Sequence, residues 1–193
     1  MIMIRMLELQ NLLIQNLLQE MHFQICSEAL TRKRILVLIK RQAYQKKRIK
    51  KVMMLERYKF IEDPSADVLY NAYGNDLKEL FSNTAEAMFS VICDLDKVEH
   101  KKEEVFKISG EDLDTTLFNW LAGLLAIIET EGMFFSKFEI IEVDEGHIKA
   151  RLYGEPIREE IKKEEIAAVT NYKFDVIKTD DGYEATVSID LKR

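Results

Sequence analysis

The sequence is poor in residues that interrupt or cross-link a chain. Its 193 residues include two prolines, seven glycines, two cysteines and one tryptophan. Cys26 and Cys93 are far apart and form no CxxC pair, which disfavours a disulfide framework and a structural zinc site. We therefore expect a reducing cytoplasm, with both thiols lining the core. No segment has the charged start, apolar centre and small-residue cleavage site of a secretory signal.

Glycine and proline are absent from the first 57 residues, and the charge balance changes at the same point. Residues 1–57 carry 12 Lys and Arg against 4 Asp and Glu, whereas residues 58–193 carry 16 against 30. We predict a basic, helical N-terminal extension over 1–57 and a separate domain over 58–193. The extension is either a basic arm for RNA or an acidic partner, or an accessory, even non-native, leader. A shorter protein could begin at Met53 or Met54.

Long apolar runs are also missing. The run over residues 120–128 is far shorter than the ~20 residues that span a bilayer, so neither a membrane anchor nor a membrane partner is expected. It lies within residues 113–135, where helical spacing of apolar side chains predicts a buried core helix. Asp112 suits the start of this helix and Gly132 its end. The apolar positions are Leu113, Leu117, Trp120, Leu121, Leu124, Ile127 and Ile128.

The remaining elements follow from their apolar periods and turn residues. A second amphipathic helix is predicted to begin at Asp76 and run to Ile92. Asp-Glu-Gly at 144–146 and Asp-Asp-Gly at 180–182 predict hairpin turns. Strands are predicted at 58–61, 68–73, 103–109, 138–143, 147–153, 166–178 and 183–191. These elements predict an α+β fold, a two-layer sandwich of a β-sheet with both helices packed on one face.

Most catalytic signatures are missing from the sequence. It contains no GxxxxGKS or GxxxxGKT loop, no GxGxxG, no GxSxG and no HExxH. His22, His100 and His147 are isolated in the sequence, which favours solvated or packed histidines over a base or a metal ligand. The sequence therefore does not point to a familiar class of nucleotide-binding or hydrolytic enzyme.

Carboxylates remain as candidate functional groups. Asp63 and Asp67 bracket a Pro-Ser-Ala turn between two predicted strands, and Asp190 interrupts an apolar strand near the C-terminus. Asp is disfavoured in strands, so Asp190 requires a reason. Because Asp190 alternates with Ile189, facing water is one sufficient reason. Spacing alone leaves structural, metal-binding and catalytic roles open.

A series of short stretches resembles the archease family over nearly all of residues 58–193. Asp-Pro-Ser-Ala-Asp at 63–67 resembles the family's Asp or Glu followed by His-Thr-Ala-Asp, and residues 72–81 resemble its A-x-G-x-T-L-E-E-L-F. The other stretches, in order, are Asp112-Leu113, Trp120-Leu121, Glu129-Thr130-Glu131-Gly132, Gly154-Glu155-Pro156, Ala168-Val169-Thr170 and Ile189-Asp190-Leu191. No single stretch is unique, but their order makes the resemblance specific.

The resemblance implies an accessory protein of tRNA metabolism and not an enzyme in its own right. Archeases assist the GTP-dependent RNA ligase that seals tRNA exons, promoting its guanylylation and turnover, and the family has also been associated with a tRNA methyltransferase. Their fold is an α+β sandwich of strand-helix-strand-strand units. The resemblance further implies a divalent cation, usually Ca²⁺, held by Asp67 and Asp190, with the carbonyl of Leu191 as a further ligand. Such oxygen-only ligation suits Ca²⁺ or Mg²⁺.

Three positions depart from the family pattern. Pro64 and Ser65 replace its usual His and Thr, and Ala167 replaces its usual Lys. Pro64 removes a titratable ring but stiffens the turn before Asp67. A basic contact to the ligase or its nucleotide is therefore either missing or supplied by another residue, such as Lys173.

Two alternatives to a ligase activator stay open. One is a chaperone-like module, such as a modulator of a tRNA methyltransferase, in which the carboxylates are structural. The other is a metal-dependent phosphoryl-transfer enzyme that uses Asp63, Asp67 and Asp190. The missing nucleotide-binding loop and the lack of a recognisable base count against the enzyme.

Overall fold

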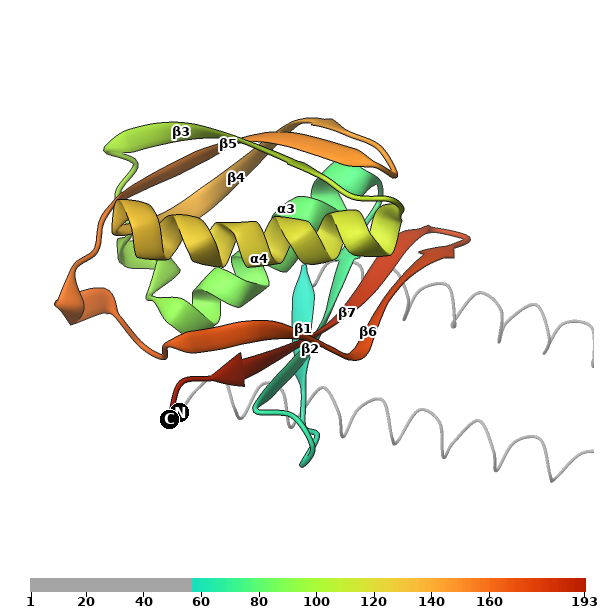
Figure 1. Ribbon diagram of the computed structural model, residues 1–193, viewed down its shortest axis with the longest axis horizontal. Coiled ribbons are helices and arrows are strands. Elements are labelled where there is room, and N and C mark those ends of the chain that lie inside the picture. The colour runs from blue at the N-terminus through green and yellow to red at the C-terminus, as the bar shows by residue number, and fades with distance from the viewer. Residues whose placement is uncertain (1–56) are drawn as a thin grey trace, which may run out of the picture. The chain divides into compact units, whose positions relative to one another are not determined.

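The computed structural model describes residues 57–193. The predicted helical extension lies outside these residues except for Arg57, and so do Cys26 and His22. In chain order the elements are β1 (Tyr58–Ile61), β2 (Val68–Gly74), α3 (Leu77–Ile92), the 3₁₀ turn η1 (Leu95–Lys97), β3 (Lys102–Ser109), α4 (Leu113–Glu131), β4 (Met133–Val143), β5 (His147–Pro156), the 3₁₀ turn η2 (Glu159–Ile161), β6 (Ile166–Thr179) and β7 (Gly182–Leu191) (Figure 1).

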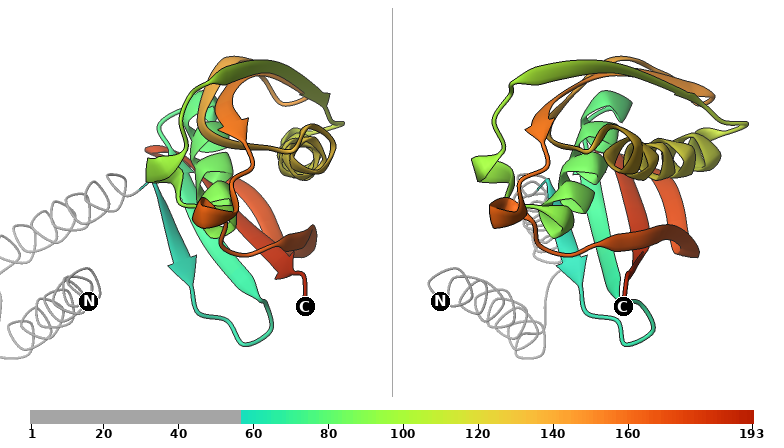
Figure 2. Two further views of the ribbon diagram at one scale, coloured as in Figure 1. Left: turned by 90° about the vertical axis from the view of Figure 1, so that its left-hand side faces the viewer. Right: turned by 60° about the vertical axis from the view of Figure 1, so that its left-hand side comes forward.

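The α+β class is confirmed, and the order of elements agrees with the prediction. The seven strands of the described region form two antiparallel sheets where one was expected, with strand orders β1-β2-β7-β6 and β3-β5-β4. Both helices lie between the two sheets (Figure 2). Helix α3 contacts β2 and β4, and α4 contacts β6 and β3. Each helix therefore packs against sheet on two sides, which a single apolar stripe does not reveal.

Helix α4 has the predicted ends and supplies much of the core. The Asp112 carboxylate accepts a hydrogen bond from Thr115 N at 2.8 Å, and Gly132 ends the helix with φ 60°. The indole of Trp120 is fully buried and donates to the carbonyl of Phe81 at 3.1 Å. Four of the predicted apolar positions are buried, namely Leu117, Trp120, Leu121 and Leu124, whereas Leu113, Ile127 and Ile128 are half-buried.

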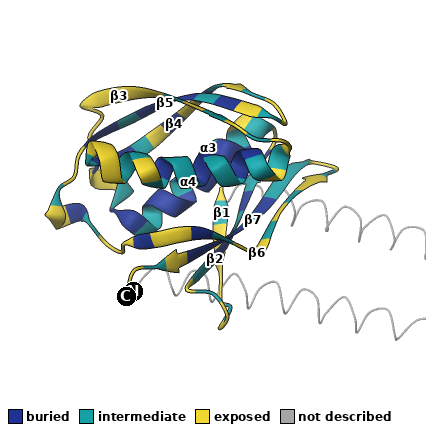
Figure 3. Ribbon diagram, in the orientation of Figure 1, coloured by how far each residue is buried: buried dark blue, intermediate teal, exposed yellow. Residues whose placement is uncertain are grey.

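The buried side chains gather where the helices face the sheets (Figure 3). Strand β4 begins at Met133, five residues before the predicted start, because Phe134 and Phe135 are also buried in pairing with β5. Cys93 is buried as predicted, and burial raises the pKa of its thiol to about 12. Among the described residues, no helix has the length and apolar character needed to cross a membrane.

Candidate cation site

The pairing of β2 with β7 brings the two predicted aspartates together. Val68 lies opposite Ile189 in this antiparallel pair. Asp67 comes just before Val68 in the chain, and Asp190 comes just after Ile189. Because the strands are antiparallel, both aspartates lie one position beyond this pair, at neighbouring positions on the two strands. Ile189 is fully buried and Asp190 is exposed, which puts Asp190 on the face of the sheet away from the helices. The pairing that the predicted site requires is therefore present.

Asp67 is held by groups at the end of β7. Its Oδ2 accepts a hydrogen bond from Leu191 N at 3.1 Å, and Arg193 Nη2 lies 3.4 Å from its Oδ1. The hydrogen bond from Leu191 N lowers the pKa of the Asp67 carboxyl, and the Arg193 guanidinium lowers it further. Asp67 is therefore ionised at neutral pH, as a cation ligand must be.

The turn before Asp67 is organised by Asp63. Asp63 Oδ1 accepts from Ser65 N at 2.9 Å, and the Asp63 carbonyl accepts from Ala66 N at 3.2 Å. Its other carboxylate oxygen accepts from Lys173 Nζ at 2.6 Å and from Tyr172 Oη at 3.3 Å. The pKa of Asp63 is lowered, first of all by the bond from Lys173. Asp63 is thus committed to the loop, which leaves Asp67 and Asp190 as the carboxylates that could hold a cation.

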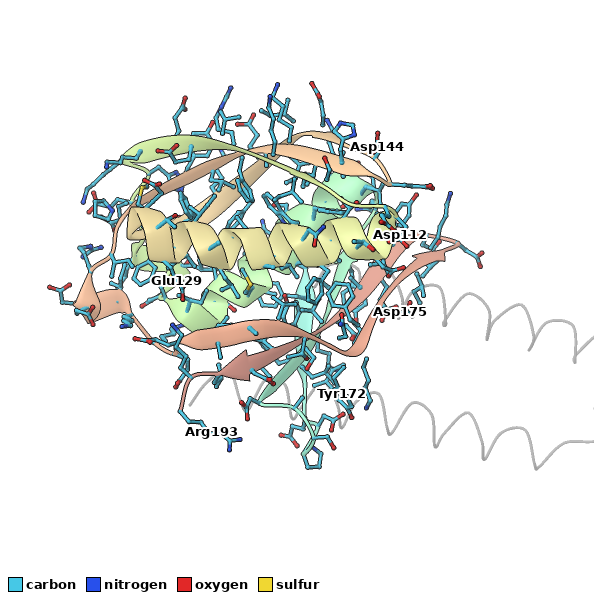
Figure 4. All side chains as sticks on the ribbon, in the orientation of Figure 1. Asp112, Glu129, Asp144, Tyr172, Asp175 and Arg193 are labelled. Carbon is cyan, nitrogen blue, oxygen red and sulfur yellow. The ribbon has the colours of Figure 1, made fainter. Side chains whose placement is uncertain are left out.

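Asp67, Asp190 and the turn before Asp67 border an open concavity of about 390 Å³. Figure 4 shows Tyr172 and Arg193 on the side of the four-stranded sheet that faces away from the helices. Ala167 lines the concavity, so its methyl group stands where the family pattern has a Lys. The positive group beside Asp67 is Arg193, whereas the Lys173 ammonium is bound to Asp63. The lining residues are Pro64, Ser65, Ala66, Asp67, Ala167, Asp190, Leu191 and Arg193.

The donor set fits a hard cation that takes few protein ligands. Asp67, Asp190 and the Leu191 carbonyl offer only oxygen, the ligand type that Ca²⁺ and Mg²⁺ prefer. Over residues 57–193 there is no group of three or more His, Cys, Asp or Glu that could hold a metal. A six-to-eight-coordinate Ca²⁺ would therefore take most of its ligands from water or from a partner. Arg193 would also compete with it for Asp67.

Two contacts around the candidate site were not predicted from the sequence, those of Arg193 with Asp67 and of Tyr172 with Asp63. Arg193 lies two residues beyond β7, and no local signal links it to Asp67. Tyr172 was also not selected, although aromatic and basic residues adjoin at 172–173.

The two described histidines have partners that the sequence did not predict. His147 Nδ1 lies 2.7 Å from Asp144, and His100 Nε2 lies 3.1 Å from the Ser136 hydroxyl, both around the other sheet. Neither histidine joins the cation site.

Fold and site together define a small α+β domain that presents an open pair of aspartates where two strands meet. The model of the Archease protein family matches residues 58–191. The chain belongs to the archease family.

Relatives in archaea cover the same region. A protein named archease from Archaeoglobus fulgidus is 39% identical over 138 residues, which span 70% of this chain and 99% of the relative. The archease of Methanothermobacter thermautotrophicus is 40% identical over 133 residues, 67% of this chain and 95% of the relative. The solution structure of Methanobacterium thermoautotrophicum protein 1598 has a TM-score of 0.61 at 34% identity, covering 70% of this chain and 99% of that one. The α+β fold of the described domain is therefore that of an archease.

Proposed function

We propose that this protein activates a GTP-dependent tRNA-splicing RNA ligase in the cytoplasm by promoting its guanylylation and turnover. It acts as a metal-binding accessory protein with an indirect role in tRNA splicing. The proposal rests on membership of the archease family. The observation that supports a metal-dependent mechanism is the neighbouring position of Asp67 and Asp190 at an exposed strand end.

In this proposal the residues of the concavity hold a divalent cation, most plainly Ca²⁺. Asp67 and Asp190 supply carboxylates, Leu191 supplies its carbonyl, and the Leu191 N–H orients Asp67. The bound cation supplies positive charge and open coordination positions for phosphate or carboxylate oxygens of a partner. Because residues 58–193 carry 16 basic and 30 acidic residues, the domain also suits a basic surface on the ligase.

The phosphoryl-transfer alternative needs Asp63 as a third carboxylate. Asp63 is instead bonded to Lys173, Tyr172 and Ser65. Turning it toward a cation would break the contacts that organise its own turn. The described geometry therefore favours the accessory role over an enzyme that uses three carboxylates.

A guanylylation assay tests the proposal. The cognate ligase is incubated with labelled GTP and calcium, and covalent guanylate on the ligase is measured with and without this protein. Wild type should raise the rate, and Asp190→Asn should raise it much less. Asp180→Asn, at the turn of the same hairpin, is the matched control and should act like wild type.

Three outcomes would contradict parts of the proposal. Full stimulation by Asp190→Asn would remove the metal site from the mechanism. Robust nucleotide or RNA turnover by this protein without the ligase would favour the enzyme. No stimulation of the ligase, with stimulation of a tRNA methyltransferase instead, would favour the chaperone-like module.

A further inference from the structure

Strand β6 contains a four-residue bulge, whose side chains reach the loop that leads into the candidate cation site. Thr170 pairs with Ser188 of β7, and the next pair in register is Asp175 with Thr186. Residues 171–174 of β6 therefore stand opposite a single residue of β7. Bulges of this kind redirect side chains and are treated as designed features of a sheet.

The bulge sends its side chains to two different places. Phe174 packs edge-on against Phe118 of α4, with ring centroids 5.4 Å apart. Tyr172 and Lys173 instead reach the β1–β2 loop, where both donate to Asp63 Oδ2. The bulge thus links helix α4, on the inner side of the sheet, to the loop that leads into Asp67.

Lys173 adopts a backbone conformation that favours glycine. Its φ is 52°, and it is the one non-glycine residue with positive φ among residues 57–193. A lysine has no local hydrogen bond that repays this conformation, unlike Asn or Asp. Such residues persist where surrounding contacts over-determine them, and they concentrate at functional sites. The contact that Lys173 gains is its 2.6 Å ion pair with Asp63.

This ion pair is partly shielded from water. The Asp63 side chain is 11% exposed and that of Lys173 is 54% exposed. Without the ammonium, a nearly buried carboxylate would keep only Tyr172 and its own turn as partners, which favours its movement toward water. Movement of Asp63 would release Ser65 N, and with it the turn that sets the position of Asp67.

We propose that Lys173 is a positioning residue: by holding Asp63 from the β6 bulge, it fixes the 63–66 turn so that Asp67 meets Asp190. The assignment of Asp67 as a cation ligand rests on the proposed function above. The tether between β6 and the β1–β2 loop rests on the described contacts alone.

Amide hydrogen exchange in the full-length, metal-free protein tests the tether. Lys173→Met keeps the aliphatic stem and removes the charge, Lys173→Arg keeps a donor, and Lys178→Met is a matched control on the same strand. We expect exchange at Ser65 and Ala66 to be about tenfold faster in Lys173→Met, because their turn opens more often. Lys173→Arg and Lys178→Met should stay close to wild type. Unchanged exchange in Lys173→Met would overturn the inference.

Calorimetric titration with calcium chloride tests the positioning role. Supporting residues of this kind change metal affinity by about tenfold or more, so the Kd of Lys173→Met should rise by about that factor, with Lys173→Arg largely restored. Faster exchange with an unchanged Kd would overturn the positioning role and leave the proposed site standing. If wild type binds no calcium, the proposed site fails and positioning fails with it. The exchange data would then still decide whether Lys173 holds the loop.

Discussion

The Asp67 carboxylate accepts a hydrogen bond from the backbone N–H of Leu191 at 3.1 Å, which ties the end of the β1–β2 loop to the last strand. The same strand carries Asp190 at the position next to Asp67. Two neighbouring carboxylates repel each other, and within residues 57–193 the cation that lies beside Asp67 to offset this is Arg193. A divalent cation would relieve the repulsion more completely.

Calcium should therefore raise the melting temperature. Binding to the native state alone stabilises it by about 2.7 kcal/mol when free calcium is a hundredfold above Kd. For a domain of this size, each kcal/mol raises Tm by about 2–4 °C. Scanning calorimetry of wild type should show this rise and its reversal by a chelator, whereas Asp67→Asn and Asp190→Asn should show neither.

Asp180→Asn controls for the loss of an exposed carboxylate from the same hairpin and should keep the response to calcium. A wild-type Tm that is indifferent to millimolar calcium, magnesium and manganese would eliminate the site as proposed. Because Arg193 competes for Asp67, Arg193→Ala should bind calcium more tightly than wild type.

Leu124→Ala tests the core around α4. Leu124 is fully buried, so its truncation should lower the free energy of unfolding by about 2–5 kcal/mol. Leu125→Ala removes the same atoms from the next residue, which is half-buried, and should cost clearly less. Urea unfolding followed by circular dichroism measures both. A cost near zero for Leu124→Ala would mean that the apolar face of α4 has been misassigned.

The elements of the fold could be predicted because their signals are local. Asp112 and Gly132 mark the two ends of α4 within a few residues of the apolar stripe that they enclose. The division into two sheets could not be predicted in this way. It depends on which strands pair, and pairs such as β2 with β7 join strands that are far apart in the sequence. An amphipathic stripe shows that a helix is buried on one side and says little about the other.

The candidate site could be predicted only in part. Asp67 and Asp190 were candidates from their place in the sequence, but their role as cation ligands came from the archease resemblance, because spacing alone left structural, metal-binding and catalytic roles open. Their neighbouring position depends on the pairing of β2 with β7, whose partner residues are 109 to 121 positions apart, and local pattern does not specify such a pairing. The contacts of Tyr172 and Lys173 depend on a bulge in β6, and bulges leave no reliable mark in a strand's alternation.

Gly154→Ala tests the close approach of β5 to β4. A Cβ at Gly154 would lie 1.9 Å from the carbonyl oxygen of Phe134, which is backbone and cannot turn aside. The substitution should therefore cost at least the roughly 1–3 kcal/mol typical of overpacking. Gly146→Ala is the control, because its nearest neighbour would be 3.5 Å away. Urea unfolding should show a small change for Gly146→Ala, and a similarly small change for Gly154→Ala would contradict the described register.

Glu155 has a buried carboxylate that should make stability depend on acid pH. Its side chain is 1% exposed, and it accepts bonds from Arg158 Nη2 at 2.8 Å, Lys101 Nζ at 2.7 Å and Glu99 N at 3.1 Å. The bonds from Arg158, then Lys101, lower the pKa of Glu155 from 4.5 to about 2. The folded state therefore holds Glu155 ionised at a pH where the unfolded chain has begun to protonate it.

The sign of the effect follows from linkage. The contribution of Glu155 is fully present above its unfolded pKa of 4.5 and is lost as pH falls through about 2. Glu155→Gln removes this contribution, so the variant should be less stable than wild type at neutral pH, and the difference should shrink between about pH 4.5 and pH 2. Other carboxylates titrate in the same range, so the quantity to compare is the difference between urea midpoints measured at each pH.

Glu99→Gln, which changes an exposed partner of Lys101, should show little of this dependence. If the wild-type advantage over Glu155→Gln stays constant down to about pH 2, the bonds from Arg158 and Lys101 do not lower the pKa of Glu155 in the folded state.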